Sequence, residues 1–249
     1  MPEILPGVHV VPSAQGVGFP GAGTMNICLL VEDGQITMID AGLPGNSVAV
    51  LSYLAEIGLA PAAIRRIIIT HHHVDHVGGL PELLKLTQAE VWAHRDDAAV
   101  IEGTAPRAGI PPERVAAMLA SLPDDQRAAA QERMKQMREV PPVAVDLRLV
   151  GGEELSVLGG VQILHSPGHT AGHLCLFLPA LSLLVAGDLL RLLEDNVIRE
   201  SPAGIAVDAD QALASARQIV TLKFEGFIGY HGGYVVSGAQ GLLSDSLIC

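Results

Sequence analysis

The sequence of 249 residues contains little cysteine, few aromatic residues and no long apolar run. Its three cysteines, Cys28, Cys175 and Cys249, are widely spaced and form no CxxC pair, which argues against a disulfide framework and favours a reducing compartment. Cys28 and Cys175 lie in apolar, strand-like runs, so we expect both to be buried structural thiols. Aromatic residues make up only 3% of the chain. The core must therefore be built mainly from Leu, Val, Ile and Ala.

Basic residues are also scarce, with 15 Lys and Arg against 27 Asp and Glu and a net charge of −12. Because no Lys/Arg-rich run occurs, nucleic-acid phosphates would be repelled, and we expect no nucleic-acid partner. The first residues lack a basic region followed by an apolar one, and no apolar stretch reaches the roughly 18 residues of a membrane span. We expect a cytoplasmic protein that acts on a small molecule and does not bind a membrane.

The pattern of strands and helices predicts an α/β protein, and the length suits a single domain over residues 1–249. Two halves each run from strands to a helix, so two sheets flanked by helices are the simplest architecture. We expect strands at residues 8–11, 25–31, 35–40, 66–69, 91–93, 147–150, 155–158, 161–164, 173–178, 181–186 and 226–230. We expect helices at residues 47–58, 80–86, 96–101, 112–122, 124–138 and 208–222. In the first of these helices we expect Asn46 or Ser47 as the cap and an apolar core face of Val48, Leu51, Leu54 and Ala55.

The segment from about residue 94 to 140 has a helical pattern and is too long for a simple connection between strands. It forms either a lid over a site or outer packing. An apolar face on it would also suit a homodimer.

Four side chains that bind metals well follow the apolar run at residues 67–69: His71, His73, Asp75 and His76. Imidazole and carboxylate together suit zinc and related first-row ions better than calcium or magnesium. Because alternate residues of an extended chain share a side, His71 and His73 can converge on one ion. Asp75 and His76, just past the bend, can reach a second. The alternative is a surface histidine cluster without function.

The motif His71-x-His73-x-Asp75-His76 resembles the HxHxDH signature of the metallo-β-lactamase-fold superfamily. Further motifs similar to those of the family follow in its order. They are Met38-Ile39-Asp40-Ala41-Gly42 before the signature, and Ser166-Pro167-Gly168-His169-Thr170 with Gly172-His173, Ala186-Gly187-Asp188 and Gly229-Tyr230-His231-Gly232 after it. The resemblance implies a four-layer αββα sandwich with a helical insertion around residues 94–140.

The resemblance also implies the ligands of two metal ions. The first ion would take His71, His73 and His169, the second would take Asp75, His76 and His231, and Asp188 would bridge the two. Asp75 and Asp188 are accordingly the expected catalytic residues. The expected cofactor is two Zn²⁺ per chain, with iron or manganese as alternatives.

Further residues near these motifs are expected to support the site. Asp40 has the character of an acceptor that orients a ligand imidazole. His72, His165 and His173 are interpreted as structural. Arg191 and Asn196 follow Asp188 closely and are candidates to face the substrate.

The residue at position 188 indicates which branches of the family the chain resembles most. Common β-lactamases carry cysteine there, whereas a bridging aspartate is typical of glyoxalase II-like thioesterases, homoserine lactonases and several phosphodiesterases. The lactonases commonly have a tyrosine three residues later, where this chain has Arg191. The few residues after His231 leave no room for the helical domain with which glyoxalase II binds glutathione, so we do not expect hydroxyacylglutathione as substrate.

The hypothesis that follows is a dinuclear zinc hydrolase whose metal-bridging hydroxide attacks a small ester-type carbonyl compound, a lactone or a thioester. A second hypothesis is an oxidoreductase similar to persulfide dioxygenases, with a single iron on His71, His169 and Asp188. A phosphodiesterase and a non-catalytic binding protein that kept the fold are two further hypotheses.

Overall fold

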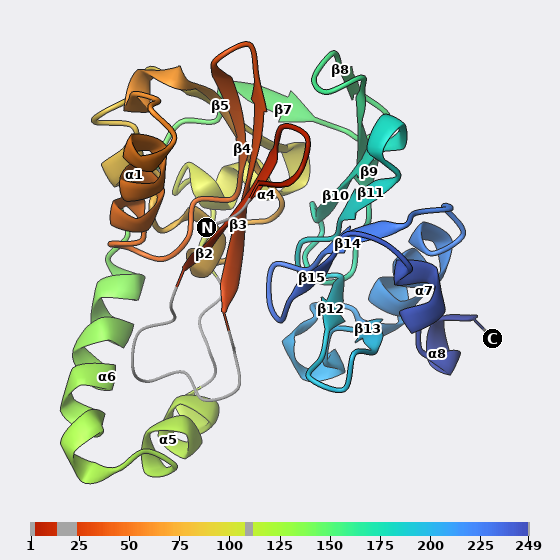
Figure 1. Ribbon diagram of the computed structural model, residues 1–249. Coiled ribbons are helices and arrows are strands. Elements are labelled where there is room, and N and C mark those ends of the chain that lie inside the picture. The colour runs from red at the N-terminus through yellow and green to blue at the C-terminus, as the bar shows by residue number, and fades with distance from the viewer. Residues whose placement is uncertain (1–2, 14–23, 108–111, 249) are drawn as a thin grey trace.

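Two mixed β-sheets face each other in the computed structural model, which describes residues 3–13, 24–107 and 112–248 (Figure 1). The first sheet has the order β1-β2-β3-β4-β5-β6-β7. Neighbours from β1 to β4 are antiparallel and those from β4 to β7 are parallel. Its strands are β1 (Glu3–Leu5), β2 (Val8–Ser13), β3 (Met25–Glu32), β4 (Gln35–Ile39), β5 (Ile64–Ile69), β6 (Glu90–His94) and β7 (Leu147–Leu149).

The second sheet has the order β15-β14-β11-β10-β9-β8, with only β11 and β14 parallel. A separate hairpin of two short strands, β12 and β13, lies beside it. The strands are β8 (Glu154–Leu155), β9 (Val161–His165), β10 (Leu174–Leu178), β11 (Leu183–Val185), β12 (Leu190–Leu192), β13 (Ile198–Glu200), β14 (Gly226–Ile228) and β15 (Tyr234–Val235).

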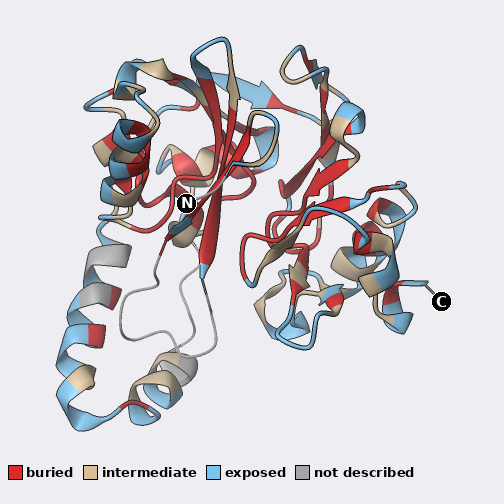
Figure 2. Ribbon diagram, in the orientation of Figure 1, coloured by how far each residue is buried: buried red, intermediate tan, exposed pale blue. Residues whose placement is uncertain are grey.

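Helices cover the outer face of each sheet, so the predicted αββα order of layers is confirmed (Figure 1). The first sheet is covered by α1 (Ser47–Glu56), α2 (Val74–Val77), α3 (Leu80–Leu83) and α4 (Arg95–Ile101), and the second by α7 (Ala209–Ile219) and α8 (Asp245–Ile248). Strand β5 shows why the layers form. Ile67 and Ile69 pack toward the helices, whereas Ile68 packs between the sheets, because successive side chains of a strand point to opposite faces. Both faces of the second half of β5 are buried, which explains the apolar run at residues 67–69 (Figure 2).

The predicted insertion between β6 and β7 is present and contains α4, α5 (Pro112–Ala120) and α6 (Asp124–Arg138). Helices α5 and α6 extend away from the two sheets (Figure 1). Much of α6 is exposed in the part that the structure describes, and Met134 and Ala130 are among its buried residues.

Helix α1 differs in detail from the prediction. Its buried residues are Ser47, Val50, Tyr53 and Leu54, whereas Val48, which we expected in the core, is 65% exposed. Asn46 precedes the helix as expected, but its side chain accepts the N–H of Leu43 and does not cap the helix.

The remaining differences concern short elements. The expected strand at residues 155–158 is only Glu154–Leu155, because the chain turns at Leu158, whose φ is 49°. Strands β1, β12, β13 and β15 and helices α2 and α8 were not expected. Within the described ranges, no helix is long and apolar enough to span a membrane.

Candidate metal centre

The histidine loop begins where β5 ends, at the carboxyl edge of the parallel part of the first sheet. The N–H of Thr70 donates to Oδ1 of Asp40 over 2.8 Å, which joins this loop to the end of β4. The loop then turns directly into α2, which carries Asp75 and His76. His71, His73, Asp75 and His76 are therefore placed by a strand end, as predicted, and by one helical turn that was not expected.

Two glycines allow the surrounding loops to approach closely. A Cβ on Gly79 would lie 2.1 Å from the carbonyl oxygen of Ala41, where the loops after β4 and α2 meet. Gly168 has a φ of +126°, and a Cβ there would lie 2.1 Å from the backbone nitrogen of Ala212 in α7. Larger residues would push either loop away from the site.

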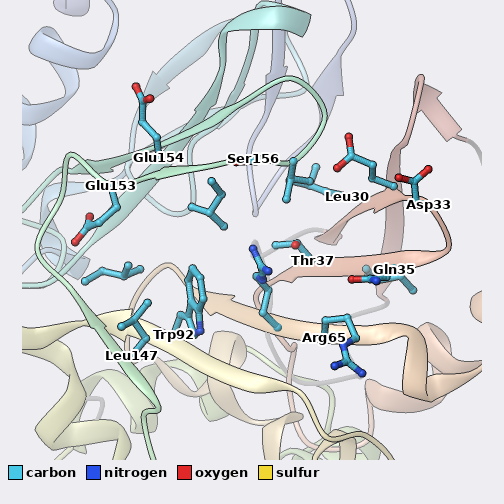
Figure 3. A pocket seen from close by; sticks show the side chains of 16 residues that line it. Leu30, Asp33, Gln35, Thr37, Arg65, Trp92, Leu147, Glu153, Glu154 and Ser156 are labelled. Carbon is cyan, nitrogen blue, oxygen red and sulfur yellow. The ribbon is translucent and has the colours of Figure 1, made fainter.

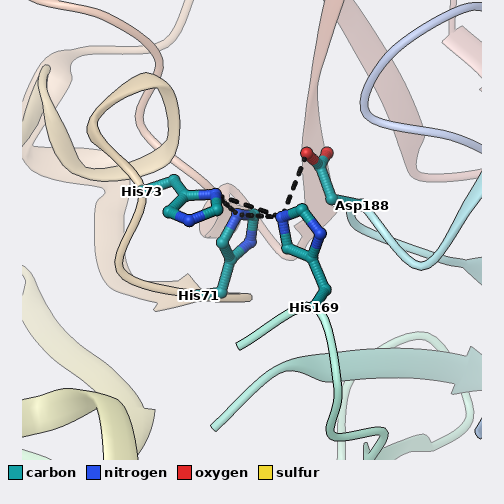
Figure 4. A group of neighbouring side chains, drawn as sticks. All are labelled: His71, His73, His169 and Asp188. Atoms are coloured by element: carbon teal, nitrogen blue, oxygen red, sulfur yellow. Dashed lines mark hydrogen bonds and ion pairs between the residues drawn. The ribbon is translucent and has the colours of Figure 1, made fainter. Parts of the chain in front are cut away.

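The first group of predicted ligands comes together from three separate segments (Figure 4). Nε2 of His71 lies 2.9 Å from Nδ1 of His73 and 3.1 Å from Nε2 of His169. Nδ1 of His73 and Nε2 of His169 are 3.1 Å apart. Three ring nitrogens thus converge on one point, and Asp188 faces the same point with Oδ2 3.5 Å from Nε2 of His169.

The second group consists of Asp75, His76 and His231. Oδ2 of Asp75 lies 3.0 Å from Nε2 of His231 and 3.8 Å from Nε2 of His76. Asp188 also reaches this group, with Oδ1 3.4 Å from Nε2 of His76 and Oδ2 3.5 Å from Nε2 of His231. The carboxylate of Asp188 therefore lies between the two groups.

Asp40 makes the contact that we expected of it. Its Oδ2 lies 2.9 Å from Nδ1 of His76, and both its oxygens accept from the hydroxyl of Thr70. Since Nδ1 is engaged in this way, His76 presents Nε2 to the site. Asp40 has a φ of +62°, an uncommon conformation that places its carboxylate beneath the histidine loop.

Asp97 is a buried supporting residue that the sequence did not reveal. One oxygen accepts the N–H of Gly172 at 2.8 Å, and the other accepts the N–H of His72 at 3.0 Å and the hydroxyl of Thr170 at 2.8 Å. The same oxygen lies 3.0 Å from Nδ1 of His72. Asp97 therefore joins the loop of His71 and His73 to the loop of His169. An aspartate in the first turn of a helix is common, so its sequence context signals only a helix start.

His173 supports the site from the opposite side. The N–H of Asp188 donates to its Nε2 over 3.1 Å, and its Nδ1 lies 2.9 Å from the hydroxyl of Ser166. His72 and His173 thus have structural contacts, as predicted.

His165 and His94 form a stacked pair outside the site, with ring centroids 4.0 Å apart and planes 11° from parallel. Asp96 lies close to both. Nδ1 of His94 already accepts the N–H of Asp96 at the start of α4, and Nε2 of His165 lies 2.9 Å from the carbonyl oxygen of Ala171. This pair is structural.

The two substrate candidates lie in the β12–β13 hairpin. Arg191 is half-buried, and its Nε has no hydrogen-bond partner among the described residues. Asn196 is exposed and occupies a tight turn with a φ of 58°.

Burial and charge set the protonation of the site. Desolvation lowers the pKa of His73 to about 4 and holds the pKa of His71 well below its ordinary value. Burial alone would raise the pKa of Asp188, but the charges of His231 and His76 hold it well below the usual range. Burial would lower the pKa of His76, yet Asp40 and Asp188 raise it well above its ordinary value. The imidazoles of the first group are therefore neutral. In the second group, the surrounding carboxylates stabilise a positive charge at His76.

The donors suit bound cations. One proton cannot satisfy three ring nitrogens that face one another, whereas a metal ion can accept a lone pair from each. Nε2 of His76 and Oδ1 of Asp188 are buried and lack a hydrogen-bond partner among the described residues. Nitrogen and carboxylate donors favour zinc, iron or manganese over calcium.

A cavity of about 260 Å³ adjoins His169 and Asp188. Its walls come mainly from small and apolar residues, with Glu200, Ser201 and Asp210 as polar members. The apolar and small members are Leu189, Pro202, Ala203, Ala206, Ala209, Ala212 and Leu213.

Known proteins are similar to this chain in sequence and fold. A family model described as the metallo-beta-lactamase superfamily matches residues 21–229. A hydroxyacylglutathione hydrolase of Xylella fastidiosa (strain M12) is 28% identical over 213 residues, which are 85% of this chain and 60% of the relative. The probable metallo-hydrolase YflN of Bacillus subtilis (strain 168) is 24% identical over 241 residues, which are 91% of this chain and 86% of the relative.

A solved structure has a similar fold. The crystal structure of a metallo-beta-lactamase family protein from Thermus thermophilus superposes with a TM-score of 0.70 at 26% identity, covering 96% of this chain and 77% of the other. The fold and the paired His/Asp groups define the class, a metallo-beta-lactamase fold with side chains that could hold metal ions. The chain belongs to the metallo-beta-lactamase superfamily, so the resemblance seen in its motifs is confirmed. It spans about 60% of the length of the Xylella hydroxyacylglutathione hydrolases.

Proposed function

We propose that this chain is a dinuclear zinc hydrolase that cleaves a small ester-type carbonyl substrate, a thioester or a lactone. The position of Asp188 carries the proposal, since its two oxygens lie 3.4–3.5 Å from ring nitrogens of both ligand groups. A carboxylate between two sets of three donors is the arrangement that two nearby ions require.

Each predicted ligand then has a definite role. His71, His73 and His169 would hold one ion, Asp75, His76 and His231 the other, and Asp188 both. Two zinc ions would supply a hydroxide nucleophile at neutral pH and a Lewis acid for the carbonyl oxygen.

The supporting residues fix the geometry around these ligands. Asp40 orients the ring of His76, and Asp97 fixes the spacing between the histidine loop and the His169 loop. His173 holds the backbone of Asp188.

The cavity beside His169 and Asp188 supports a compact, uncharged acyl group. Its walls are mostly apolar, and its charged members, Glu200 and Asp210, are both acidic. A phosphodiester would meet repulsion from these carboxylates. The same argument disfavours the carboxylates of glutathione. The relatives named hydroxyacylglutathione hydrolase support a thioester, but with a different leaving group.

The first test is the metal content of protein purified without chelators, measured by elemental analysis. Two equivalents of zinc, or of zinc mixed with manganese or iron, support the proposal. One equivalent of iron with little zinc would contradict it and favour a mononuclear dioxygenase that uses His71, His169 and Asp188.

The second test is turnover of a panel of lactones, thioesters, phosphodiesters and β-lactams by the metal-replete enzyme. We expect turnover of lactones or thioesters, with a loss of about 100-fold or more in Asp188→Asn because the bridging carboxylate is lost. Asp195→Asn removes an exposed carboxylate from the β12–β13 hairpin and is the control. Absence of turnover across the panel would refute the hydrolase.

A further inference from the structure

A second cavity, of about 580 Å³, is lined by residues of both sheets (Figure 3). Arg66 lines it near the start of β5, whereas His71 follows the end of that strand. At about 3.3 Å per residue the two are roughly 16 Å apart along the strand direction. The cavity is therefore separate from the catalytic site.

The residues that face this cavity depart from the pattern of the core. Leu30, Thr37 and Arg66 are register partners across β3, β4 and β5, so they form one row on one face of the sheet. Leu30 belongs to the apolar layer between the sheets. The adjacent row, Cys28, Ile39 and Ile68, is entirely apolar and buried. The row at the cavity thus places a hydroxyl and a guanidinium where the sheet otherwise presents core residues.

Neither of these polar groups is satisfied by the described residues. No carboxylate oxygen among them lies within 4.0 Å of the Arg66 guanidinium, and none of them hydrogen-bonds the hydroxyl of Thr37. Thr37 is 5% exposed. The Arg66 guanidinium instead lies over the ring of Trp92, 4.8 Å from its centroid. Five N–H donors of Arg66 remain available in a half-buried position.

The rest of the cavity combines an apolar wall with an acidic rim. Trp92, Leu149, Leu155 and Val157 form the wall. On the rim, Glu32 accepts the N–H of Leu158, and Glu153 accepts two backbone N–H groups. Asp33 and Glu154, also on the rim, are exposed.

This charge distribution selects among ligands. The guanidinium inside favours an anion, whereas the four rim carboxylates disfavour a ligand with several negative charges. The apolar wall favours a ligand with a hydrocarbon body.

We propose that this cavity binds a small amphipathic monocarboxylate, whose carboxylate contacts Arg66 and Thr37 and whose hydrocarbon part lies against Trp92 and the leucines. A planar carboxylate matches the fork of an arginine side chain. The site is independent of the metal centre.

Trp92 reports on this cavity directly, because it is the only tryptophan in the sequence. The experiment titrates the full-length protein with octanoate, octan-1-ol and octylammonium, which share one chain and differ in head group, and follows tryptophan emission. We expect a saturable blue shift with octanoate, since the hydrocarbon chain covers a partly exposed indole. Octanol should bind about tenfold more weakly, and octylammonium weaker still, because the charge-assisted hydrogen bonds are missing. Protein with and without its metals should give the same octanoate affinity.

Variants distinguish a specific contact between Arg66 and the ligand from an effect of the overall charge of the protein. Arg66→Gln should weaken octanoate binding by about tenfold or more, and Thr37→Val by a few fold. Arg65→Gln is the matched control, because Arg65 is exposed at the edge of the cavity and points away from Thr37 and Trp92 (Figure 3). It should change the affinity less than about twofold.

Several outcomes would overturn the proposal. The proposal would be wrong if octanoate gave no saturable shift, or if octanol bound the wild-type protein as tightly as octanoate. Arg66 would then only pack against Trp92. Equal losses in Arg65→Gln and Arg66→Gln would show that only the overall charge matters. The comparison of head groups needs no variant, so a misfolded Arg66→Gln protein does not prevent the test.

Discussion

The backbone N–H of Asp188 donates to Nε2 of His173, with 3.1 Å between the two nitrogens. Because Nε2 accepts, the ring proton resides on Nδ1 and points to the hydroxyl of Ser166, 2.9 Å away. His173 is fully buried and does not line the cavity beside His169 and Asp188. Its imidazole therefore fixes the backbone from which the proposed bridging carboxylate extends.

Replacing His173 tests this positioning role. His173→Ala leaves a buried N–H without an acceptor and opens a cavity, so we expect a loss of about 2–4 kcal/mol in the free energy of unfolding. Zinc affinity should fall by about 10–100-fold, as it does when a residue supporting a metal ligand is lost. His173→Gln keeps an acceptor and a donor and should retain most of both. Denaturant unfolding and competition with a zinc chelator measure the two quantities. Wild-type zinc affinity in His173→Ala would contradict the role.

The acid dependence of stability gives a second prediction. Burial, followed by the charge of His169, lowers the pKa of His173 to about 3 in the folded protein, against about 6.5 in the unfolded chain. Above pH 6.5 both states hold the ring neutral. Below it only the unfolded state takes the proton, so the wild type loses stability as pH falls toward 3, at up to about 1.4 kcal/mol per pH unit.

His173→Gln lacks this proton and should be less sensitive to acid. Between pH 7 and pH 5 the difference in unfolding free energy between the wild type and His173→Gln should shrink by about 2 kcal/mol. Urea unfolding of the chelated proteins at pH 7, 6 and 5 measures it. A difference that stays constant with pH would show that His173 accepts a proton in the folded state.

The site residues that were predicted from the sequence differ from the one that was missed in how far apart in the sequence their contacts are. The cluster at residues 71–76 is local, because a strand and one helical turn place all four side chains. His169, Asp188 and His231 are isolated in sequence and were assigned only through their motifs. Asp97 acts across more than 70 residues, on Thr170 and Gly172, and no local pattern signals such a contact.

The fold shows the same division. Long apolar strands such as β3 and β10 were found because both faces are buried, whereas β12, β13 and β15 have only two or three residues each. Such short strands depend on tertiary pairing more than on their own propensity. In α1 only Leu54 of the predicted core face is fully buried. The other large buried residues are Val50 and Tyr53, which the apolar pattern did not indicate.

Asp97 gives a third prediction, with a matched control one residue away. Asp97→Ala removes an acceptor shared by the two ligand loops, so we expect a loss of about 2–4 kcal/mol in stability. Zinc affinity should also fall about 10–100-fold. Asp96→Ala removes a carboxylate that is 44% exposed and should change stability by about 0.5 kcal/mol or less. Denaturant unfolding and zinc competition compare the two variants. Similar effects in both would mean that loss of charge near α4, and not the joining of the loops, is responsible.

The two buried cysteines give the last prediction, which concerns the core. Cys28 and Cys175 are both 0% exposed, and burial raises the pKa of Cys175 to about 12 and that of Cys28 further. A thiol reacts as its thiolate, so neither should react in the folded protein at pH 8. A Cys249→Ser variant leaves only these two thiols, and DTNB should then label almost none before unfolding and both after it. Rapid labelling of one thiol in the native variant would show that the layer containing it opens locally, and Cys28→Ala and Cys175→Ala would identify whether the opening lies between the sheets or beneath α7.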